Sequence, residues 1–311
     1  MPFEPRVHGG AREGVVDFSV SVNSYGPHPE VLAAARNAAF DRYPDPTARR
    51  ARQALSALTG VDSDHIVVGN GAADLLWAVA RACVPRGARV FIAEPTFSEF
   101  SAAIGDAATV TSPAEADVIY LCNPNNPTGT CAPLADIAAR AADRPHTRFI
   151  VDESFLSLSE RAGEAQTPLP ENVVRVRSLT KDHALPGLRV GYLIAAPKIA
   201  AAIDAARPAW SASAPAQAAA IAAAAHFDFV ADSRRRLLAD RDRLIAELRE
   251  RGHSPQPSAT HFFLLPTENA TALCARLLGR GVAVRDCSSF GLPHHVRIAA
   301  RPDFAKLLEA L

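Results

Sequence analysis

Short apolar runs alternate with amphipathic stretches through the middle of the chain. The runs that have the length of buried strands cover residues 65–68, 89–93, 117–122, 148–151 and 173–177. Helical spacing of apolar residues follows the first of them, over residues 73–83. Alternation of strands with helices is typical of a parallel sheet covered by helices. The pattern therefore predicts an α/β fold with a mostly parallel sheet.

Other patterns flank this region on both sides. Residues 29–40 and 47–58 have helical spacing and are separated by the turn-forming sequence Arg42-Tyr43-Pro44-Asp45-Pro46. Beyond residue 206 come an alanine-rich stretch over 212–225, a charged amphipathic helix over 233–250 and an α+β remainder. We expect a large α/β domain over 42–206. A smaller α+β domain would combine the N-terminal arm, 1–41, with residues 207–311.

Composition and charge exclude several classes of protein. The 311 residues include 33 Lys and Arg against 33 Asp and Glu, so no general polyanion-binding surface is indicated and we expect no nucleic-acid partner. No apolar run reaches membrane-spanning length, and the N-terminus lacks the layout of a secretory signal. We expect a cytoplasmic protein with no membrane partner. Five cysteines without a CxxC pair indicate reduced thiols, neither a disulfide framework nor a metal site.

The main candidate chemistry lies in residues 178–192. Lys181 follows the predicted strand 173–177, with Ser178 and Thr180 beside it and Arg189 eight residues later. A lysine amine forms imines with carbonyl cofactors, and the phosphate of pyridoxal phosphate needs hydroxyl and guanidinium donors. A solvated surface position is the commoner fate of a single lysine. The residues around Lys181 favour the cofactor interpretation.

Polar or glycine-rich segments follow other predicted strands. Gly69-Asn70-Gly71-Ala72 precedes a helix, where backbone N–H groups can bind an anion, although tight turns also use glycine. The seven turn-forming residues of Asn123–Gly129 would fix the backbone so that one asparagine side chain points in a defined direction. Asp152 ends an apolar strand, where a buried carboxylate needs a cationic partner such as a pyridinium, or it could begin a helix. Phe97 could stack on a planar ring or fill the core, and composition alone favours a place in the core.

Together these motifs resemble fold-type I pyridoxal phosphate enzymes, the aspartate aminotransferase superfamily. The resemblance runs nearly end to end, and it implies a homodimer with active sites at the subunit interface. It implies Lys181 as the internal aldimine, Asp152 as partner of the pyridine nitrogen, Asn126 as donor to the ring 3-oxygen and Phe97 as the stacking ring. The residues implied to hold the phosphate are Gly71, Ala72, Ser178, Thr180, Arg189 and, from the neighbouring subunit, Tyr43.

Within the superfamily the chain is similar to two branches, histidinol-phosphate aminotransferases and threonine-phosphate decarboxylases of cobalamin synthesis. His8-Gly9-Gly10, Asn23, and the two arginines Arg285 and Arg297 resemble the decarboxylase branch. There the corresponding residues contact the phosphate and carboxylate of the substrate, and guanidinium groups suit both anions. Without the family, the arginines lie at the ends of short strands and could be surface charges.

The choice of reaction depends on Phe155 together with His8, Asn23, Arg285 and Arg297. Histidinol-phosphate aminotransferases usually have a tyrosine at this position, whereas phenylalanine also occurs in the decarboxylase branch. We therefore expect a decarboxylase of a small phosphorylated amino acid such as threonine phosphate. The alternative is an aminotransferase of histidinol phosphate or of an aromatic amino acid. A non-catalytic protein of this fold would have little reason to keep the lysine, aspartate, asparagine and phosphate-binding residues together.

Some positions depart from the family pattern. Asp182-His183 replaces an aromatic pair that often follows the lysine, and we expect His183 to face solvent. Tyr25 stands where the decarboxylase branch commonly has Pro-Leu. The segments 105–116 and 140–146 are short for this superfamily. We expect the lost loops to reshape the mouth of the pocket.

Overall fold

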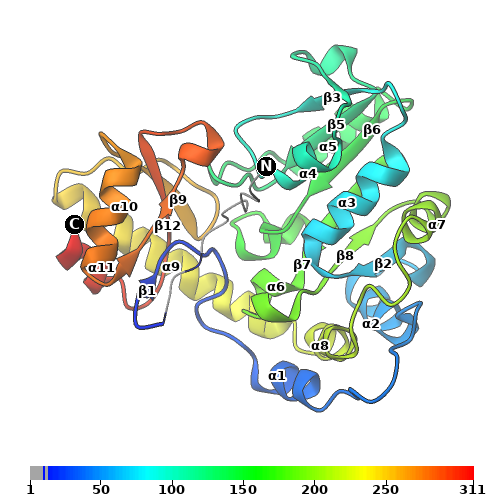
Figure 1. Cartoon of the computed structure of the whole chain (residues 1–311), viewed down its shortest axis with the longest axis horizontal. Helices are drawn as coiled ribbons and strands as arrows, with labels where there is room; N and C mark the ends of the chain where they lie inside the picture. Colours follow the sequence, from blue (N-terminus) through cyan, green and yellow to red (C-terminus); the bar gives the residue numbers. More distant parts are fainter. Residues whose placement is uncertain (1–9, 11–12) are drawn as a thin grey trace, which may run out of the picture.

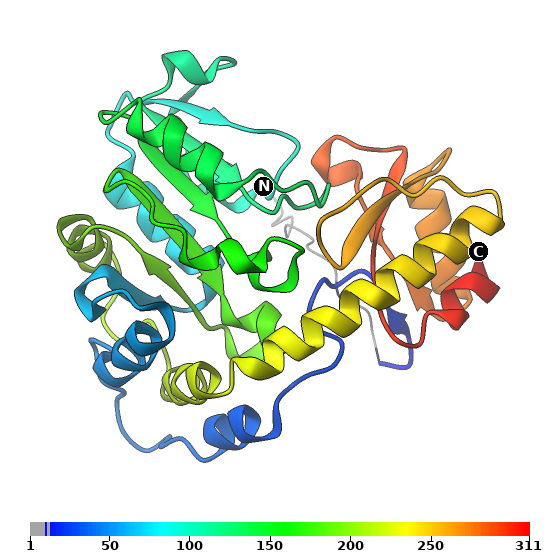
Figure 2. The same cartoon turned by 180° about the vertical axis from the view of Figure 1, so that it is seen from behind.

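The computed structural model describes residue 10 and residues 13–311, arranged as a larger part around a seven-stranded sheet and a smaller part around a three-stranded sheet (Figure 1). His8, one of the expected substrate contacts, lies outside the described residues. The long helix α9 (Asp228–Glu250) runs from the smaller part toward the larger one, as the view from behind shows (Figure 2).

The seven-stranded sheet has the order β2-β8-β7-β6-β5-β3-β4. Only β8 runs antiparallel to its neighbours, so the predicted mostly parallel sheet is confirmed. The five predicted strands correspond to β2, β3, β5, β6 and β7, and each begins and ends within one residue of its prediction, whereas no bounds were predicted for β4 and β8. The bounds of the strands in this sheet are β2 (Ile66–Gly69), β3 (Arg89–Ile92), β4 (Ala108–Thr109), β5 (Val118–Cys122), β6 (Arg148–Asp152), β7 (Val173–Ser178) and β8 (Gly191–Ile194).

Helices cover both faces of this sheet. One face packs against α3 (Gly71–Cys83), α4 (Glu99–Ala103) and α7 (Pro197–Ala205). The other face packs against α5 (Leu134–Ala142) at one end and α2 (Arg49–Thr59) with α8 (Ala214–Ala225) at the other. Successive strand residues serve opposite faces, as Ile150 and Val151 of β6 do. The strands are therefore apolar on both faces, which is what made them recognisable as short unbroken runs.

The smaller part is built on an antiparallel sheet of β9 (Phe262–Pro266), β12 (His295–Ala299) and β11 (Arg285–Asp286). Helices α10 (Ala270–Gly279) and α11 (Ala305–Ala310) and the C-terminal half of α9 pack on it. The N-terminal strand β1 (Val16–Asp17) pairs with β10 (Val282–Ala283), so the start of the described chain belongs to this part.

Two helices, α1 (Pro29–Arg36) and α8, pack with the larger part of the molecule, although the sequence predicts that they belong to the smaller domain. Helices α1 and α8 share one apolar core with β2 and β8 of the large sheet, whereas 1–41 and 207–311 were assigned to the small domain. We propose that the boundary falls within α9. Helix α1 also ends four residues before the predicted residue 40, because its buried stripe ends at Ala35. No described helix combines the length and the apolarity needed to cross a membrane.

Candidate active site

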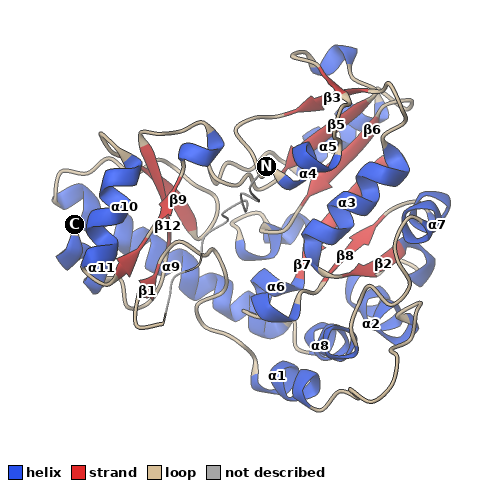
Figure 3. Ribbon diagram, viewed as in Figure 1, coloured by secondary structure: helices blue, strands red, loops and turns tan. Residues whose placement is uncertain are grey.

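A cavity opens at the carboxyl ends of β5, β6 and β7. The N-terminus of α3 lies at the same edge of the sheet (Figure 3). Ligands of open α/β sheets bind at this edge because parallel strands end there together. Strand register places Cys122, Asp152 and Val176 side by side. The residues that line the cavity are Ala72, Ala73, Phe97, Cys122, Asn126, Asp152, Ser154, Phe155, Ser178, Thr180, Lys181 and Arg189.

Lys181 reaches this cavity from a short helix, α6 (Leu179–Asp182), directly after β7. Its Nζ lies 5.6 Å from the centre of the Phe155 ring. Burial lowers the pKa of Lys181 to about 8, and the charges of Arg297 and Arg189 act in the same direction, against the opposing carboxylate of Asp152. A larger fraction of this amine than of an ordinary lysine is therefore uncharged near neutral pH and able to attack a carbonyl carbon.

Asp152 ends β6 on the floor of the cavity. Its Oδ1 accepts a hydrogen bond from the Ser154 main chain at 2.9 Å, and its Oδ2 lies 3.4 Å from the Tyr120 hydroxyl. Burial raises the pKa of Asp152, and the contacts with Ser154, Tyr120 and Lys181 oppose this shift. A buried carboxylate of this kind is best stabilised by a cation that binds beside it. A protonated ring nitrogen meets that requirement.

The loop Asn123–Gly129 brings one of its asparagines to the cavity. Asn123 bonds the main chain of Ala132 through both side-chain atoms, at 2.8 and 2.9 Å. Asn125 donates to the Pro95 carbonyl at 2.9 Å. These two side chains therefore brace the loop, and Asn126 is the one that lines the cavity.

The expected phosphate-binding residues lie together at the N-terminus of α3. Gly71 has φ 84°, and a Cβ built on it would lie 2.6 Å from the Arg189 guanidinium. Only glycine fits that conformation and that close approach without strain. The hydroxyls of Ser178 and Thr180 lie 2.6 Å apart. Backbone N–H groups at a helix start, two hydroxyls and a guanidinium form a site suited to a phosphate.

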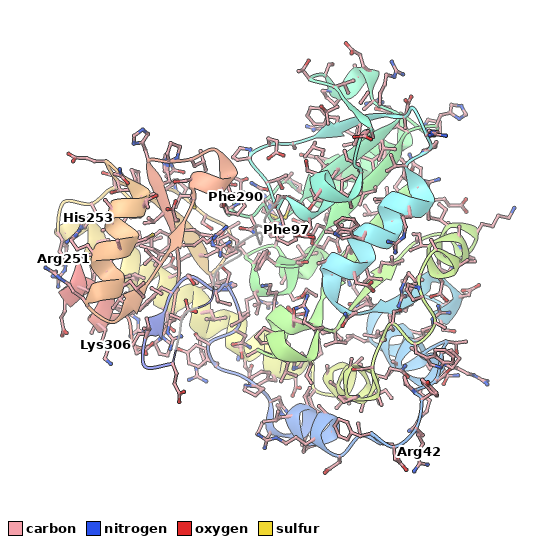
Figure 4. All side chains as sticks on the ribbon, viewed as in Figure 1. Arg42, Phe97, Arg251, His253, Phe290 and Lys306 are labelled. Atoms are coloured by element: carbon pink, nitrogen blue, oxygen red, sulfur yellow. The ribbon has the colours of Figure 1, made fainter. Side chains whose placement is uncertain are left out.

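The two arginines that were expected to bind the substrate anions belong to the smaller part of the molecule. Arg285 and Arg297 are directly opposite in the β11–β12 ladder, so their side chains share one face of the sheet. Arg297 lies in the middle of β12, not at a strand end, and donates hydrogen bonds to Asn126 Oδ1 and to the Ser19 carbonyl. Arg285 donates to Ser289 at 2.8 Å and lies over the Phe290 ring. Figure 4 shows Phe97 of the larger part and Phe290 of the smaller part on facing sides of this region.

Some predicted residues lie elsewhere. Tyr43 is 79% exposed and stacks on Trp210, with ring centres 4.7 Å apart. The side chain of Asn23 is turned toward the main chain of Asp182, to which it donates at 2.8 Å. The expectation that His183 faces solvent is wrong: its ring is fully buried and stacks on Phe229. Phe227 and Phe229 at the start of α9 pack against it, a contact that the local sequence could not reveal.

The sequence did not single out Cys122, Ser154 or Tyr120 as site residues. Cys122 ends β5 in register with Asp152, so its place at the end of a predicted strand was the one available signal. Tyr120 is fully buried against Phe100, and its link to Asp152 depends on how β5 and β6 pair. That pairing cannot be read from either strand alone.

Comparisons with known proteins extend over almost the whole chain. The family model described as aminotransferase class I and II matches residues 13–115 and 105–311. Histidinol-phosphate aminotransferase 2 of Gluconobacter oxydans is 32% identical over 308 residues, covering 92% of this chain and 87% of that protein. The histidinol-phosphate aminotransferase of Symbiobacterium thermophilum is 33% identical over 309 residues, covering 91% and 85%.

Solved structures are similar over the same extent. Histidinol-phosphate aminotransferase from Sinorhizobium meliloti, in complex with pyridoxal-5'-phosphate, has a TM-score of 0.83 at 28% identity, covering 95% of this chain and 89% of that one. L-threonine-O-3-phosphate decarboxylase from Porphyromonas gingivalis has a TM-score of 0.84 at 28% identity, covering 95% and 97%. The resemblance drawn from the strand-end motifs is confirmed, and the chain belongs to the aminotransferase class I and II family.

Proposed function

We propose that this chain is an aminotransferase that acts on a small phosphorylated amino compound of the histidinol-phosphate type. The chain is a pyridoxal phosphate-dependent enzyme of its family. The observation that carries the proposal is the arrangement of one cavity, in which a lysine of lowered pKa faces a buried aspartate beside an anion site. When bound, pyridoxal phosphate supplies an aldehyde for the lysine and a ring that withdraws electrons from the substrate.

Each side chain then has a defined task. Lys181 holds the cofactor and moves a proton at the substrate carbon. Asp152 pairs with the ring nitrogen and keeps it protonated, while Asn126 donates to the ring oxygen. Phe97 covers the ring. Gly71, Ala72, Ser178, Thr180 and Arg189 hold the phosphate.

Arg285 and Arg297 are the proposed receptors for substrate anions. An aminotransferase binds its amino donor and its oxo-acid acceptor in turn at one site. Two guanidinium groups on one face of a sheet can accept a phosphate in one half-reaction and a carboxylate in the other. The curated relatives cited above are histidinol-phosphate aminotransferases, which supports this substrate class.

Decarboxylation, the reaction first expected from the sequence, is the second candidate. Its support is the threonine-phosphate decarboxylase among the structural neighbours and Phe155, which brings a bare ring to the cavity where a tyrosine would bring a hydroxyl. The comparisons favour amino transfer, because histidinol-phosphate aminotransferases predominate among the curated relatives.

We also propose that the chain acts as a homodimer whose two sites each borrow Tyr43 from the other subunit. Phe40 and Tyr43 lie in the connection between α1 and α2, where they are 76% and 79% exposed, and Tyr43 stacks on Trp210, which precedes α8 and is 46% exposed. Large exposed aromatic side chains that lie together are typical of an interface. Figure 4 places Arg42 of this connection at the outside of the molecule.

A paired assay separates the candidates. Purified protein loaded with cofactor is incubated with histidinol phosphate and 2-oxoglutarate, and separately with threonine phosphate alone. Amino transfer predicts glutamate in the first reaction and no carbon dioxide in the second. Carbon dioxide and aminopropanol phosphate from threonine phosphate, without glutamate in the first reaction, would contradict the proposal. Lys181→Ala provides the background.

A further inference from the structure

Residues 18–25, which we call the strap, join the smaller part of the molecule to the turn that carries Lys181. At one end, Phe18 donates its N–H to the Ala283 carbonyl at 2.8 Å and accepts from the Ala299 N–H at 2.9 Å. The next residue, Ser19, accepts a hydrogen bond from Arg297 at 2.7 Å. The first residues of the strap are therefore fixed to the strand that presents Arg297.

At its other end the strap is fixed to α6. The Asn23 N–H donates to the Lys181 carbonyl at 3.0 Å, and Asn23 Nδ2 donates to the Asp182 carbonyl at 2.8 Å. Asn23 Oδ1 accepts from the Tyr25 N–H at 2.9 Å, which holds the side-chain amide in this orientation. Asn23 is only 1% exposed, so these bonds are shielded from water.

The lysine turn needs such donors. Helix α6 has four residues, and the last carbonyls of a helix have no partner within it. Buried carbonyls without a donor destabilise the conformation that contains them. Asn23 satisfies the carbonyls of both Lys181 and Asp182, so it fixes the backbone of Lys181 while the amine stays in the cavity.

We propose that Asn23 is a positioning residue, which holds the Lys181 turn in register with Arg297 through the strap. This inference rests on the proposed function, in which Lys181 carries the cofactor and Arg297 receives a substrate anion. Residues 19–23 form the covalent path between the two contacts. The strap thereby sets the distance between the group that binds the substrate and the amine that reacts with it, and small errors in that distance are costly for catalysis.

The test compares Asn23→Ala with a matched control, Asn172→Ala. Asn172 also bridges main-chain carbonyls, at 3.0, 3.0 and 2.9 Å to Ala141, Arg144 and Thr147, but at the opposite end of the parallel strands. Hydrogen exchange of residues 179–185 is measured in cofactor-free protein. The pH dependence of the cofactor absorbance, kcat and KM are measured in loaded protein.

Asn23→Ala should speed exchange at residues 179–185, shift the pH profile of the cofactor absorbance and lower kcat about tenfold, with a smaller change in KM. Asn172→Ala should leave these readouts near wild type even where it lowers the melting temperature. Asn23→Asp keeps the acceptor for Tyr25 and loses the donor to Asp182, so it should behave like Asn23→Ala. It also keeps the test decisive if the alanine variant does not fold.

Unchanged exchange and an unchanged pH profile in both Asn23 variants would overturn the inference. A rise in KM alone would also overturn it, since that result would make Asn23 a direct substrate contact. If wild-type protein binds no cofactor, the proposed function fails, yet exchange in cofactor-free protein still decides whether Asn23 holds the turn.

Discussion

His183 is a buried histidine that the cofactor site does not use. Neither ring nitrogen has a hydrogen-bond partner among the described residues. Burial, together with the charges of His28 and His226, lowers the pKa of His183 to about 4. The folded chain therefore keeps this ring neutral at a pH at which the unfolded chain already binds a proton.

We predict that His183→Phe raises the melting temperature, and that the gain is larger at pH 5 than at pH 8. Below about pH 6.5 the unfolded wild-type chain takes up a proton at His183, so stability is lost as the pH falls toward 4. Phenylalanine removes this loss and also removes unpaired polar atoms, which is worth about 1–3 kcal/mol. Thermal unfolding across this pH range checks the prediction. The exposed His146→Phe is the control, and an equal gain at both pH values would contradict the titration argument.

At the residue scale, sequence motifs predicted several side chains that line the cavity and failed for those that act through packing. Lys181, Asp152 and Asn126 lie at the ends of strands or within four residues after them, and the parallel strands end at the same edge of the sheet. Asn23 and His183 depend on contacts with segments more than 40 residues away in sequence, such as Asn23 with Asp182 and His183 with Phe229. No local pattern specifies those contacts.

The N-terminus of α3 is the main element of the proposed phosphate site. We predict that Gly71→Ala raises the dissociation constant of the cofactor about tenfold or more while the protein still folds. A Cβ at this residue would collide with the Arg189 guanidinium, and φ 84° would strain any other residue. Tenfold corresponds to about 1.4 kcal/mol.

Equilibrium titration of cofactor-free protein with pyridoxal phosphate checks this. Gly163→Ala is the control, because a Cβ there meets nothing within 4 Å. Wild-type affinity in Gly71→Ala would show that the close approach of α3 to Arg189 does not form the phosphate site.

At the scale of elements, strands were predicted more closely than helices. A strand buried on both faces reads as an unbroken apolar run with clear ends. Helix α9 begins at Asp228, five residues before the predicted start, and has no side-chain cap there. Helix α8 is rich in alanine throughout, so its composition predicts a helix but not the face against which it packs. Its place beside α1 and α2 appears only in the folded chain.

At the scale of the whole molecule, the proposed dimer can be tested by mixing subunits. We predict a particle of twice 33.0 kDa by light scattering, and low activity for Tyr43→Ala and Lys181→Ala separately. Mixed subunits should regain part of the activity. One site of the mixed dimer then has Lys181 from one chain and Tyr43 from the other. A monomer, or no recovery in the mixture, would contradict shared sites.

The proposed reaction needs residues from both parts of the molecule. The cofactor residues come from the large sheet, whereas Arg285 and Arg297 come from the smaller one, and the strap is bonded to both. A reaction that needs both sets of groups depends on how these parts are held relative to each other.

The identity of the reactive lysine tests the central claim most directly. The other lysines, Lys198 and Lys306, are exposed, whereas Lys181 lines the cavity. Loaded protein is reduced with borohydride, digested and sequenced by mass spectrometry. We predict that the cofactor is attached to the peptide that contains Lys181, and that Lys181→Ala abolishes this attachment. Attachment to Lys198 or Lys306, or none in the wild-type protein, would contradict the account.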